Sequence, residues 1–265
     1  MSDPHTDLRQ DRPHSARMYD YLLGGKDHYQ VDATAAEAAL RQYPAGRTIA
    51  QVNRQFMHRA AKHSAESGIR QFLDIGTGIP TEPNLHQVVQ QVAAAARVVY
   101  VDNDPIVLTH ARALMTGTAE GRTEYVQADI RNPQAILDNP QVREVLNFDE
   151  PIALTLIGLL YFLPDHEDPH EILATLIDAL PSGSHLAMTH ATADFDAAAE
   201  AAAQVYRNNG VPTQLRSRDE FAGFFRGVEL LEPGVVPPHR WRASVEPLPH
   251  LDAEASLYAG IATKR

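Results

Sequence analysis

The chain of 265 residues contains no cysteine, which excludes disulfide bonds and thiolate-bound zinc. It has no apolar run near the roughly 20 residues that a membrane-spanning helix needs, and residues 1–14 lack the apolar region of a signal peptide. Positive charge is scarce, with 23 Lys and Arg against 34 Asp and Glu and a net charge of −11. Such a balance argues against wrapping a nucleic-acid backbone. We therefore expect a soluble cytoplasmic protein with no nucleic-acid or membrane partner.

Hydrophobic residues make up 44% of the chain, which is enough for a real core. The sequence divides into three parts: a charged, proline-punctuated tail over residues 1–16, expected to be mobile, a helical cap over 17–68, and an α/β domain over 69–265. Within the first 68 residues the pattern predicts helices over 15–24, 33–42 and 47–67, separated by Gly24-Gly25 and by Pro44-Ala45-Gly46.

Beyond residue 69, apolar strands alternate with helices. Strands are predicted over 70–75, 98–102, 124–128, 152–157, 185–189, 228–231 and 257–263. Helices are predicted over 83–94, from Asp104-Pro105 onward, and over 133–139, 168–180, 194–208 and 217–225, with capping boxes beginning at Asp168 and at Ser217. Near-continuous apolar strands imply a sheet covered on both faces. The prediction is an α/β fold, a doubly wound, seven-stranded, mostly parallel sheet with an N-terminal helical extension.

The strand over 70–75 runs into a glycine turn, Asp74 to Gly78 (Asp-Ile-Gly-Thr-Gly). Gly76 and Gly78 remove side chains where the backbone must approach a ligand. A dinucleotide fingerprint has a third small residue where Thr81 stands, and prolines and Glu82 surround the following helix start, which suits a pyrophosphate poorly. The loop therefore favours a ligand with a cationic sulfonium, with Asp74 as the candidate partner of its positive end; a purely structural turn is the alternative.

Acids also end the next two strands. Asp102 is placed to accept hydrogen bonds from ribose hydroxyls, in NAD and in S-adenosylmethionine alike, and Asp104 is assigned to the helix cap. Asp129 is placed to accept from an adenine amino group, with Ile130 packing on the ring. The alternatives are a helix cap for Asp102 and a solvated loop residue for Asp129.

These strand-end residues resemble those of class I S-adenosylmethionine-dependent methyltransferases. More narrowly, the chain resembles the actinobacterial "S-adenosyl methyltransferase" family, formerly a domain of unknown function. The resemblance covers almost the whole chain beyond Arg17. The matching segments are 16–27 (Ala-Arg-Met-Tyr-Asp-Tyr-Leu-Leu-Gly-Gly-Lys-Asp), 53–56, 71–81, 98–105 (Val-Val-Tyr-Val-Asp-Asn-Asp-Pro), 181–184, 216–217, 233–234 and 241–242.

The resemblance implies S-adenosyl-L-methionine as the cofactor. The cofactor-binding residues it implies on this chain are Asp74, Gly76, Gly78, Asp102, Asn103, Asp129, Ile130, Arg17 and Tyr21. Arg17 and Tyr21 belong to a polar block around Gly24-Gly25, which is expected to fold over the carboxyl ends of the strands and close the pocket. The alternative for this block is a cap that only buries apolar surface.

No general base stands out. The candidates are His190 just past the fifth strand, Tyr161 after the fourth, and His28 in the N-terminal block. The family often has histidine where Tyr161 stands, and a phenol with an unperturbed pKa of about 10 is a poorer base. A hydrogen-bonded or solvated histidine is the alternative for His190. The 13 histidines show no metal-ligand spacing, so no metal is expected.

The leading hypothesis is methyl transfer from S-adenosylmethionine to a small-molecule acceptor. Two alternatives stay open: an NAD-dependent oxidoreductase, and a non-catalytic regulator that binds S-adenosylmethionine. The sequence does not reveal the acceptor, nor whether the protein is a monomer or a dimer.

Overall fold

The computed structural model describes residues 10–107, 117–244, 248 and 250–265. The strands are β1 (Gln71–Ile75), β2 (Arg97–Asp102), β3 (Arg122–Gln127), β4 (Ile152–Leu156), β5 (His185–Ala191), β6 (Glu229–Leu230) and β7 (Leu257–Thr263). The helices are α1 (Ser15–Leu23), α2 (Gln30–Gln42), α3 (Gly46–Glu66), α4 (Leu85–Val92), α6 (Pro133–Leu137), α7 (Pro140–Val145), α8 (Pro169–Ala179), α9 (Ala198–Asn208), α10 (Arg218–Ala222) and α11 (Leu251–Ala255).

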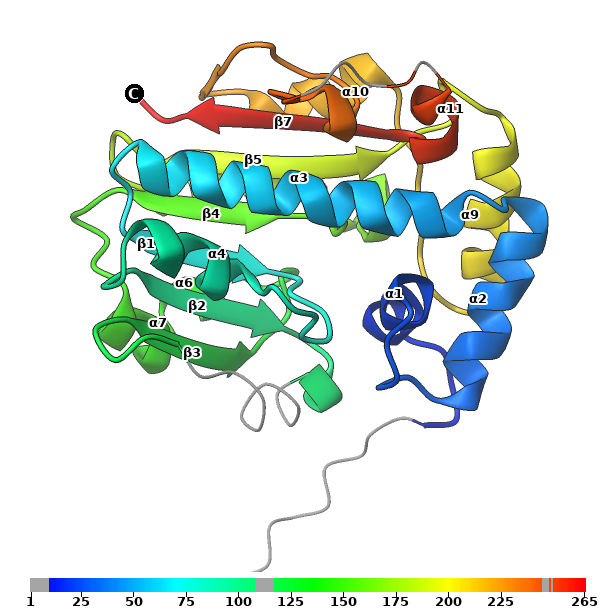
Figure 1. The fold of residues 1–265 in the computed structure, drawn as a ribbon, viewed down its shortest axis with the longest axis horizontal. Helices are drawn as coiled ribbons and strands as arrows, with labels where there is room; N and C mark the ends of the chain where they lie inside the picture. The colour runs from blue at the N-terminus through cyan, green and yellow to red at the C-terminus, as the bar shows by residue number, and fades with distance from the viewer. Residues whose placement is uncertain (1–9, 108–116, 245–247, 249) are drawn as a thin grey trace, which may run out of the picture.

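The seven strands form one sheet in the order β3-β2-β1-β4-β5-β7-β6 (Figure 1). The first five strands are parallel, and β7 runs antiparallel to both of its neighbours, β5 and β6. Chain order reverses between β1 and β4, which is the switch point where open α/β sheets bind ligands. The predicted fold class is confirmed.

The pleat of the strands divides the core into two layers. Phe72, Val98 and Tyr100 pack with α3 residues on one face. Leu73, Val99 and other alternate residues pack on the opposite face, in a larger cluster that includes residues of α6, α7 and α8. This alternation follows from the period of two along a strand. Both faces of the sheet are covered by these clusters. The polar side chains that follow the strands lie at the sheet's edge, outside both clusters.

The N-terminal helices cover that end of the sheet. In Figure 1, β1, β2 and β5 point toward the side of the molecule where α1, α2 and α9 lie, while α3 crosses one face of the sheet. α2 packs along α9, and α1 packs against α2 and α3. The cap is fastened to the C-terminal part of the chain by a hydrogen-bonded pair of hydroxyls, Tyr43 Oη and Ser256 Oγ, 3.0 Å apart. We call α1, α2 and residues 43–45 the cap.

Gly24 ends α1 as predicted. Its φ of 81° lies in the left-handed region, and its N–H donates to the last carbonyls of the helix. A Cβ on the following Gly25 would meet the Asp20 carboxylate at 1.9 Å. That carboxylate accepts from the Asp27 N–H at 3.0 Å and lies 2.9 Å from His28 Nδ1. The Gly24-Gly25 pair therefore lets the chain turn tightly around a buried acid.

Several predicted details were wrong. The Asp168 side chain makes no capping hydrogen bond and the residue has a left-handed φ of 50°, although Pro169 does begin a helix. Its backbone is set by the preceding 3-10 turn, a constraint that the capping pattern does not contain. α4 begins at Leu85 behind an Asn84 cap, two residues later than predicted, and α9 begins at Ala198 rather than Asp194. A second short helix, α7, follows α6 without having been predicted.

Two other predictions fall partly on residues outside the described part. The helix expected after Asp104 is helical over 105–107, with the Asp104 carboxylate accepting from the Ile106 N–H at 3.0 Å, and residues 108–116 are not described. Of the expected mobile tail, residues 1–9 are not described, whereas Ser15 and Ala16 begin α1.

Candidate functional site at the strand ends

A cavity of about 480 Å³ lies between the strand ends and the cap. Its floor is formed by the loops after β1, β2, β3 and β4, and its other walls come from α1, α2, α3, α9 and the segment after α9. The volume is in the range of small-molecule sites, roughly 300–1,000 Å³. The cavity opens at the switch point between β1 and β4, where the fold predicts a ligand site.

The glycine turn forms one wall of the cavity. Gly76 and Gly78 have φ values of 77° and 68°, in the left-handed region that favours glycine. A Cβ on Gly76 would meet the Leu159 side chain at 2.8 Å, whereas one on Gly78 would find only Ala16 of α1, at 3.9 Å. Gly76 therefore allows the β1 and β4 loops to pack closely, while Gly78 is required by its backbone conformation.

Asp102 ties this turn to the end of β2. Its two carboxylate oxygens accept one backbone N–H each, from Gly78 at 2.8 Å and from Asp104 at 2.9 Å. A carboxylate has about four acceptor sites, so two remain for a ligand. Burial raises the pKa of Asp102, against the lowering effect of these two hydrogen bonds. The side chain both shapes the loop and lines the cavity.

Asn103 and Asp129 meet at the neighbouring strand ends. Asn103 Nδ2 donates to Asp129 Oδ2 at 3.1 Å, and the Arg131 N–H donates to Asp129 Oδ1 at 3.0 Å. Partial burial raises the pKa of Asp129, but these hydrogen bonds and the Arg131 charge outweigh it and lower the pKa overall. Asp129 is therefore held as an anion at neutral pH. Ile130, the next residue, is buried, and Asn103, Asp129 and Ile130 all line the cavity.

Asp74 is the buried acid of the site. It accepts a hydrogen bond from Thr155 Oγ1 of β4 at 2.5 Å. Burial raises its pKa from 3.8 to about 6, and the Thr155 hydrogen bond and the Arg54 charge only partly oppose that effect. A cation bound beside Asp74 would favour its ionised form.

The structure brings seven of the nine predicted cofactor residues to the cavity and places Arg17 and Tyr21 outside its lining. Arg17 is buried, with Nε 3.4 Å from Asp32 and 3.5 Å from Asp104. Tyr21 donates to Glu37 of α2. Arg17 therefore joins α1 to α2 and to the end of β2, and Tyr21 joins α1 to α2.

Tyr19 and Arg54 are among the lining residues that the sequence did not mark as site residues. Tyr19 lies on α1 and donates to the Ala50 carbonyl at 2.9 Å, and Arg54 of α3 donates to the Pro83 carbonyl at 3.0 Å. Residues two apart on a helix face different directions. The sequence therefore predicted that the N-terminal block lies at the pocket, but it did not predict which of Tyr19 and Tyr21 faces the cavity.

His190 does not line the cavity. It is fully buried, with Nδ1 2.8 Å from the Ala191 carbonyl and Nε2 2.9 Å from Arg216 Nη1. Burial lowers its pKa to about 3, so the ring is neutral, donating through Nδ1 and accepting through Nε2. Both nitrogens are engaged, which fits the structural alternative rather than a general base.

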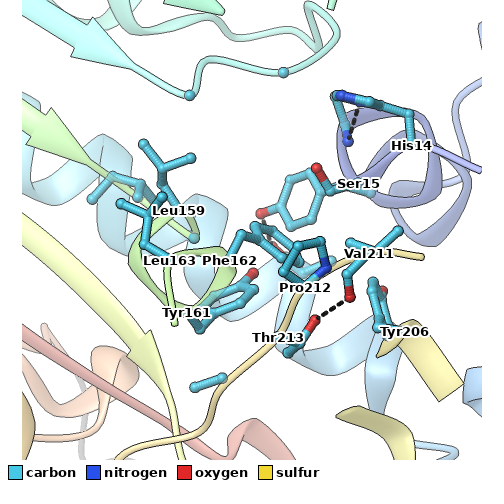
Figure 2. Close-up of a pocket in the computed structure, with 18 of the residues that line it drawn as sticks. His14, Ser15, Leu159, Tyr161, Phe162, Leu163, Tyr206, Val211, Pro212 and Thr213 are labelled. Carbon is cyan, nitrogen blue, oxygen red and sulfur yellow. Dashed lines mark hydrogen bonds between the residues drawn. The ribbon is translucent and has the colours of Figure 1, made fainter. Parts of the chain in front are cut away.

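Of the three catalytic candidates, only Tyr161 lines the cavity. Burial raises its pKa well above 10, so its phenol stays protonated at neutral pH and acts as a hydrogen-bond donor rather than a base. His28 lies outside the lining and pairs with Asp20, 2.9 Å away. Figure 2 shows Tyr161 and Phe162 next to the segment Val211-Pro212-Thr213, with His14 and Ser15 across the cavity.

The residues present fit S-adenosylmethionine on two observations. Anionic Asp129 and the partly free acceptor sites of Asp102 suit ligand hydroxyl and amino donors. The glycine turn lacks the third small residue of a pyrophosphate-binding loop, and prolines and Glu82 surround the helix start that follows it. The acidic residues Asp74 and Asp102 lie beside the turn. A ligand with positive rather than negative charge matches this wall.

In the part of the chain that the structure describes, no three acidic or histidine side chains gather as a metal site would require. Every helix among these residues falls short of the length and apolar character that crossing a bilayer demands.

Comparisons with known proteins show the family of the chain. The family model described as S-adenosyl methyltransferase matches residues 1–265. A DUF574 family protein from Streptomyces avermitilis is 45% identical, with 97% of this chain and 100% of that chain covered and a TM-score of 0.92. A protein from Thermobifida fusca described as a putative methyltransferase is 37% identical over 100% of both chains, with a TM-score of 0.91.

More distant structures show the fold alone. An O-methyltransferase family protein from Burkholderia thailandensis is 13% identical, with 97% of this chain and 65% of that chain covered and a TM-score of 0.56. No curated protein matches the chain. Neither the oxidoreductase nor the regulator hypothesis gains support from these comparisons. The chain belongs to the S-adenosyl methyltransferase family, and it is an S-adenosylmethionine-dependent methyltransferase.

Proposed function

We propose that the protein methylates a small-molecule acceptor inside the cavity, and that the cofactor is held by Asp74, Gly76, Gly78, Asp102, Asn103, Asp129 and Ile130. The observation that carries the proposal is that one cavity joins these strand-end residues to the walls formed by the cap and α9. An acceptor in this cavity would be surrounded by protein on the side away from the strands. The net charge of −11 further disfavours a nucleic-acid acceptor.

When bound, S-adenosylmethionine would supply an electrophilic methyl group for the lone pair of the acceptor, with its sulfur as the leaving group. The contribution of the chain is alignment and exclusion of water. The turn at Gly76 and Gly78 fixes one wall, and Asp102 fixes that turn to β2. Tyr161, in the loop after β4, lines the cavity as a neutral donor.

Cofactor binding is tested by isothermal titration of S-adenosylhomocysteine, the demethylated product. Asp102→Asn keeps one acceptor oxygen and the size of the side chain. We expect it to weaken binding about tenfold to a hundredfold, because hydrogen bonds to a charged group contribute roughly 1.5–3 kcal/mol. The matched control is Asp219→Asn, since the Asp219 side chain is 96% exposed on α10. Equal affinities of the two variants would contradict the assignment of Asp102.

Methyl transfer is tested with radiolabelled S-adenosylmethionine and an actinobacterial extract separated by molecular mass. Label in the low-mass fraction that disappears with Asp102→Asn supports the proposal. Label found only in protein or nucleic acid would exclude a small-molecule acceptor. Tight binding of S-adenosylhomocysteine with no label anywhere would favour the regulator.

A further inference from the structure

The charges of the cavity lining come from one set of the elements that surround it. The charged lining residues come from the β1–β3 ends, the chain before and at the start of α1, and α3. Among the described lining residues contributed by α2, α9 and the segment 209–215, none carries a charge. This part of the cavity is a chemically different environment, and a buried charge would be costly there.

Small side chains leave room on this uncharged side. Ala39 of α2 and Ala199, Ala202 and Ala203 of α9 line the cavity where these two helices pack together. Val211, after α9, packs with Ala35 and Ala36 of α2. The space is therefore bounded by aliphatic surface on two helices.

Aromatic rings from the loop after β4 and from α9 form one wall. The ring centroids of Tyr161 and Phe162 are 4.4 Å apart, and those of Phe162 and Tyr206 are 6.2 Å apart. Figure 2 shows these three side chains together with Val211 and Pro212 at one side of the cavity. Such faces offer contact for a flat apolar ring.

Two phenol hydroxyls on this wall are not used by the protein. The Tyr161 and Tyr206 hydroxyls have no hydrogen-bond partner within residues 10–107, 117–244, 248 and 250–265, although both side chains line the cavity. Burial raises the pKa of Tyr206 to about 12, so it is protonated at neutral pH, as is Tyr161. Each can donate to and accept from a neutral polar group.

We propose that this region, the acceptor chamber lined by Ala39, Ala202, Tyr161, Phe162, Tyr206 and Val211, binds a neutral ring compound that carries a hydroxyl group. The proposal rests on the methyltransferase function proposed above and names its acceptor class. The ring packs against the aromatic and aliphatic walls, and the hydroxyl meets the free phenols of Tyr161 and Tyr206. In the transfer, the carbon–oxygen bond forms, the carbon–sulfur bond breaks with its pair left on sulfur, and the hydroxyl proton is released to water.

The test is calorimetric titration of three probes into the full chain saturated with S-adenosylhomocysteine. The probes are 2-naphthol, 2-methylnaphthalene, in which a methyl group replaces the hydroxyl, and the anion 2-naphthoate. We expect 2-naphthol to bind about threefold to tenfold more tightly than 2-methylnaphthalene, the effect of about one hydrogen bond. We expect 2-naphthoate to bind at least about tenfold more weakly than 2-naphthol, because its charge must leave water.

Matched variants locate the site. Ala202→Phe fills the chamber, whereas Ala201→Phe adds the same ring at the neighbouring, exposed position of α9. We expect Ala202→Phe to abolish 2-naphthol binding and Ala201→Phe to preserve it, with S-adenosylhomocysteine affinity unchanged in both. Tyr161→Phe combined with Tyr206→Phe should remove the preference for 2-naphthol over 2-methylnaphthalene.

The outcomes separate the two proposals. If the wild-type chain does not bind S-adenosylhomocysteine, the proposed function fails. If it binds S-adenosylhomocysteine but 2-naphthoate binds as well as 2-naphthol, or no probe binds, the acceptor chamber as described is overturned. Retained 2-naphthol binding in Ala202→Phe would overturn its location.

Discussion

Asp74 is a buried carboxyl group, and its burial disfavours the ionised form. Its folded pKa of about 6 lies above the ordinary 3.8, so the folded chain holds a proton that the unfolded chain releases. The stability that this proton brings is present below about pH 4 and is lost as pH rises through about 6. With about 1.4 kcal/mol per pKa unit, the loss amounts to about 3 kcal/mol.

Asp74→Asn removes this dependence. We predict that the free energy of unfolding of the variant, relative to the wild type, rises by about 2 kcal/mol between pH 4 and pH 7. Urea unfolding at several pH values measures it. A difference that stays constant over this range would mean that Asp74 titrates like an exposed acid.

The contribution of His190 to stability changes with pH in the opposite direction. Its folded pKa of about 3 lies below the ordinary 6.5, so its contribution to stability is present above pH 6.5 and is lost as pH falls below it. Its two nitrogens are bound to the Ala191 carbonyl and Arg216. The ring thus holds β5 to the segment that contains Arg216.

We predict that His190→Gln lowers the free energy of unfolding by about 1–3 kcal/mol, because Arg216 loses its ring partner. Affinity for S-adenosylhomocysteine, measured by calorimetry, should change less than about threefold. Loss of a general base would instead lower methyl incorporation about 10²–10⁴-fold with stability intact. That pattern would restore the catalytic hypothesis for His190.

At the scale of elements, a buried ion cluster fastens the cap. Arg17 of α1 lies 3.4 Å from Asp32 of α2 and 3.5 Å from Asp104 at the end of β2. The Asp32 carboxylate also accepts from the His14 and Tyr29 N–H groups, each at 2.9 Å. One guanidinium therefore joins both cap helices to the strand end beside Asp102.

We predict that Arg17→Met lowers the free energy of unfolding by about 3–5 kcal/mol, since two buried carboxylates lose their counter-charge. Hydrogen exchange should increase first in α1 and α2, while β1, β4 and β5 stay protected. Arg41→Met, at an exposed position of α2, is the control. Equal effects of the two substitutions would show that the cluster does not fasten the cap.

The sequence predicted elements well wherever a pattern of several residues decides them. β1 and β4 are apolar on both faces, and their positions were predicted to within one residue. Asp74, Asp102 and Asp129 were placed at the cavity because parallel strands all end at one edge. Tyr19 and Arg54 were missed because their roles depend on how α1 and α3 are rotated against the sheet, which no local pattern encodes.

At the scale of the whole molecule, the cavity joins distant parts of the chain. Its walls include α1 near the start and Ser256 and Leu257 near the end. Ligand binding therefore acts on segments that are separated by more than two hundred residues, since Tyr43 and Ser256 are 213 apart.

We predict that S-adenosylhomocysteine slows hydrogen exchange in α1, α2, α9 and residues 209–215 together, because closing one cavity stabilises all its walls. Mass spectrometry of deuterium uptake with and without the ligand measures this. Protection confined to the loops after β1, β2 and β3 would mean that the ligand does not stabilise the packing of the cap on the rest of the chain.

The position of the cap also has a consequence for biosynthesis. α2 and α3 are made before the sheet, yet some of their partners lie far along the chain: Arg59 of α3 donates to the Pro238 carbonyl at 2.6 Å, and α2 packs on α9. Domains form as units when the chain supplies their contacts. A nascent chain that ends before residue 198 would thus hold α2 without α9 and Tyr43 without Ser256, and the walls of the cavity are complete only after residue 257 has been made.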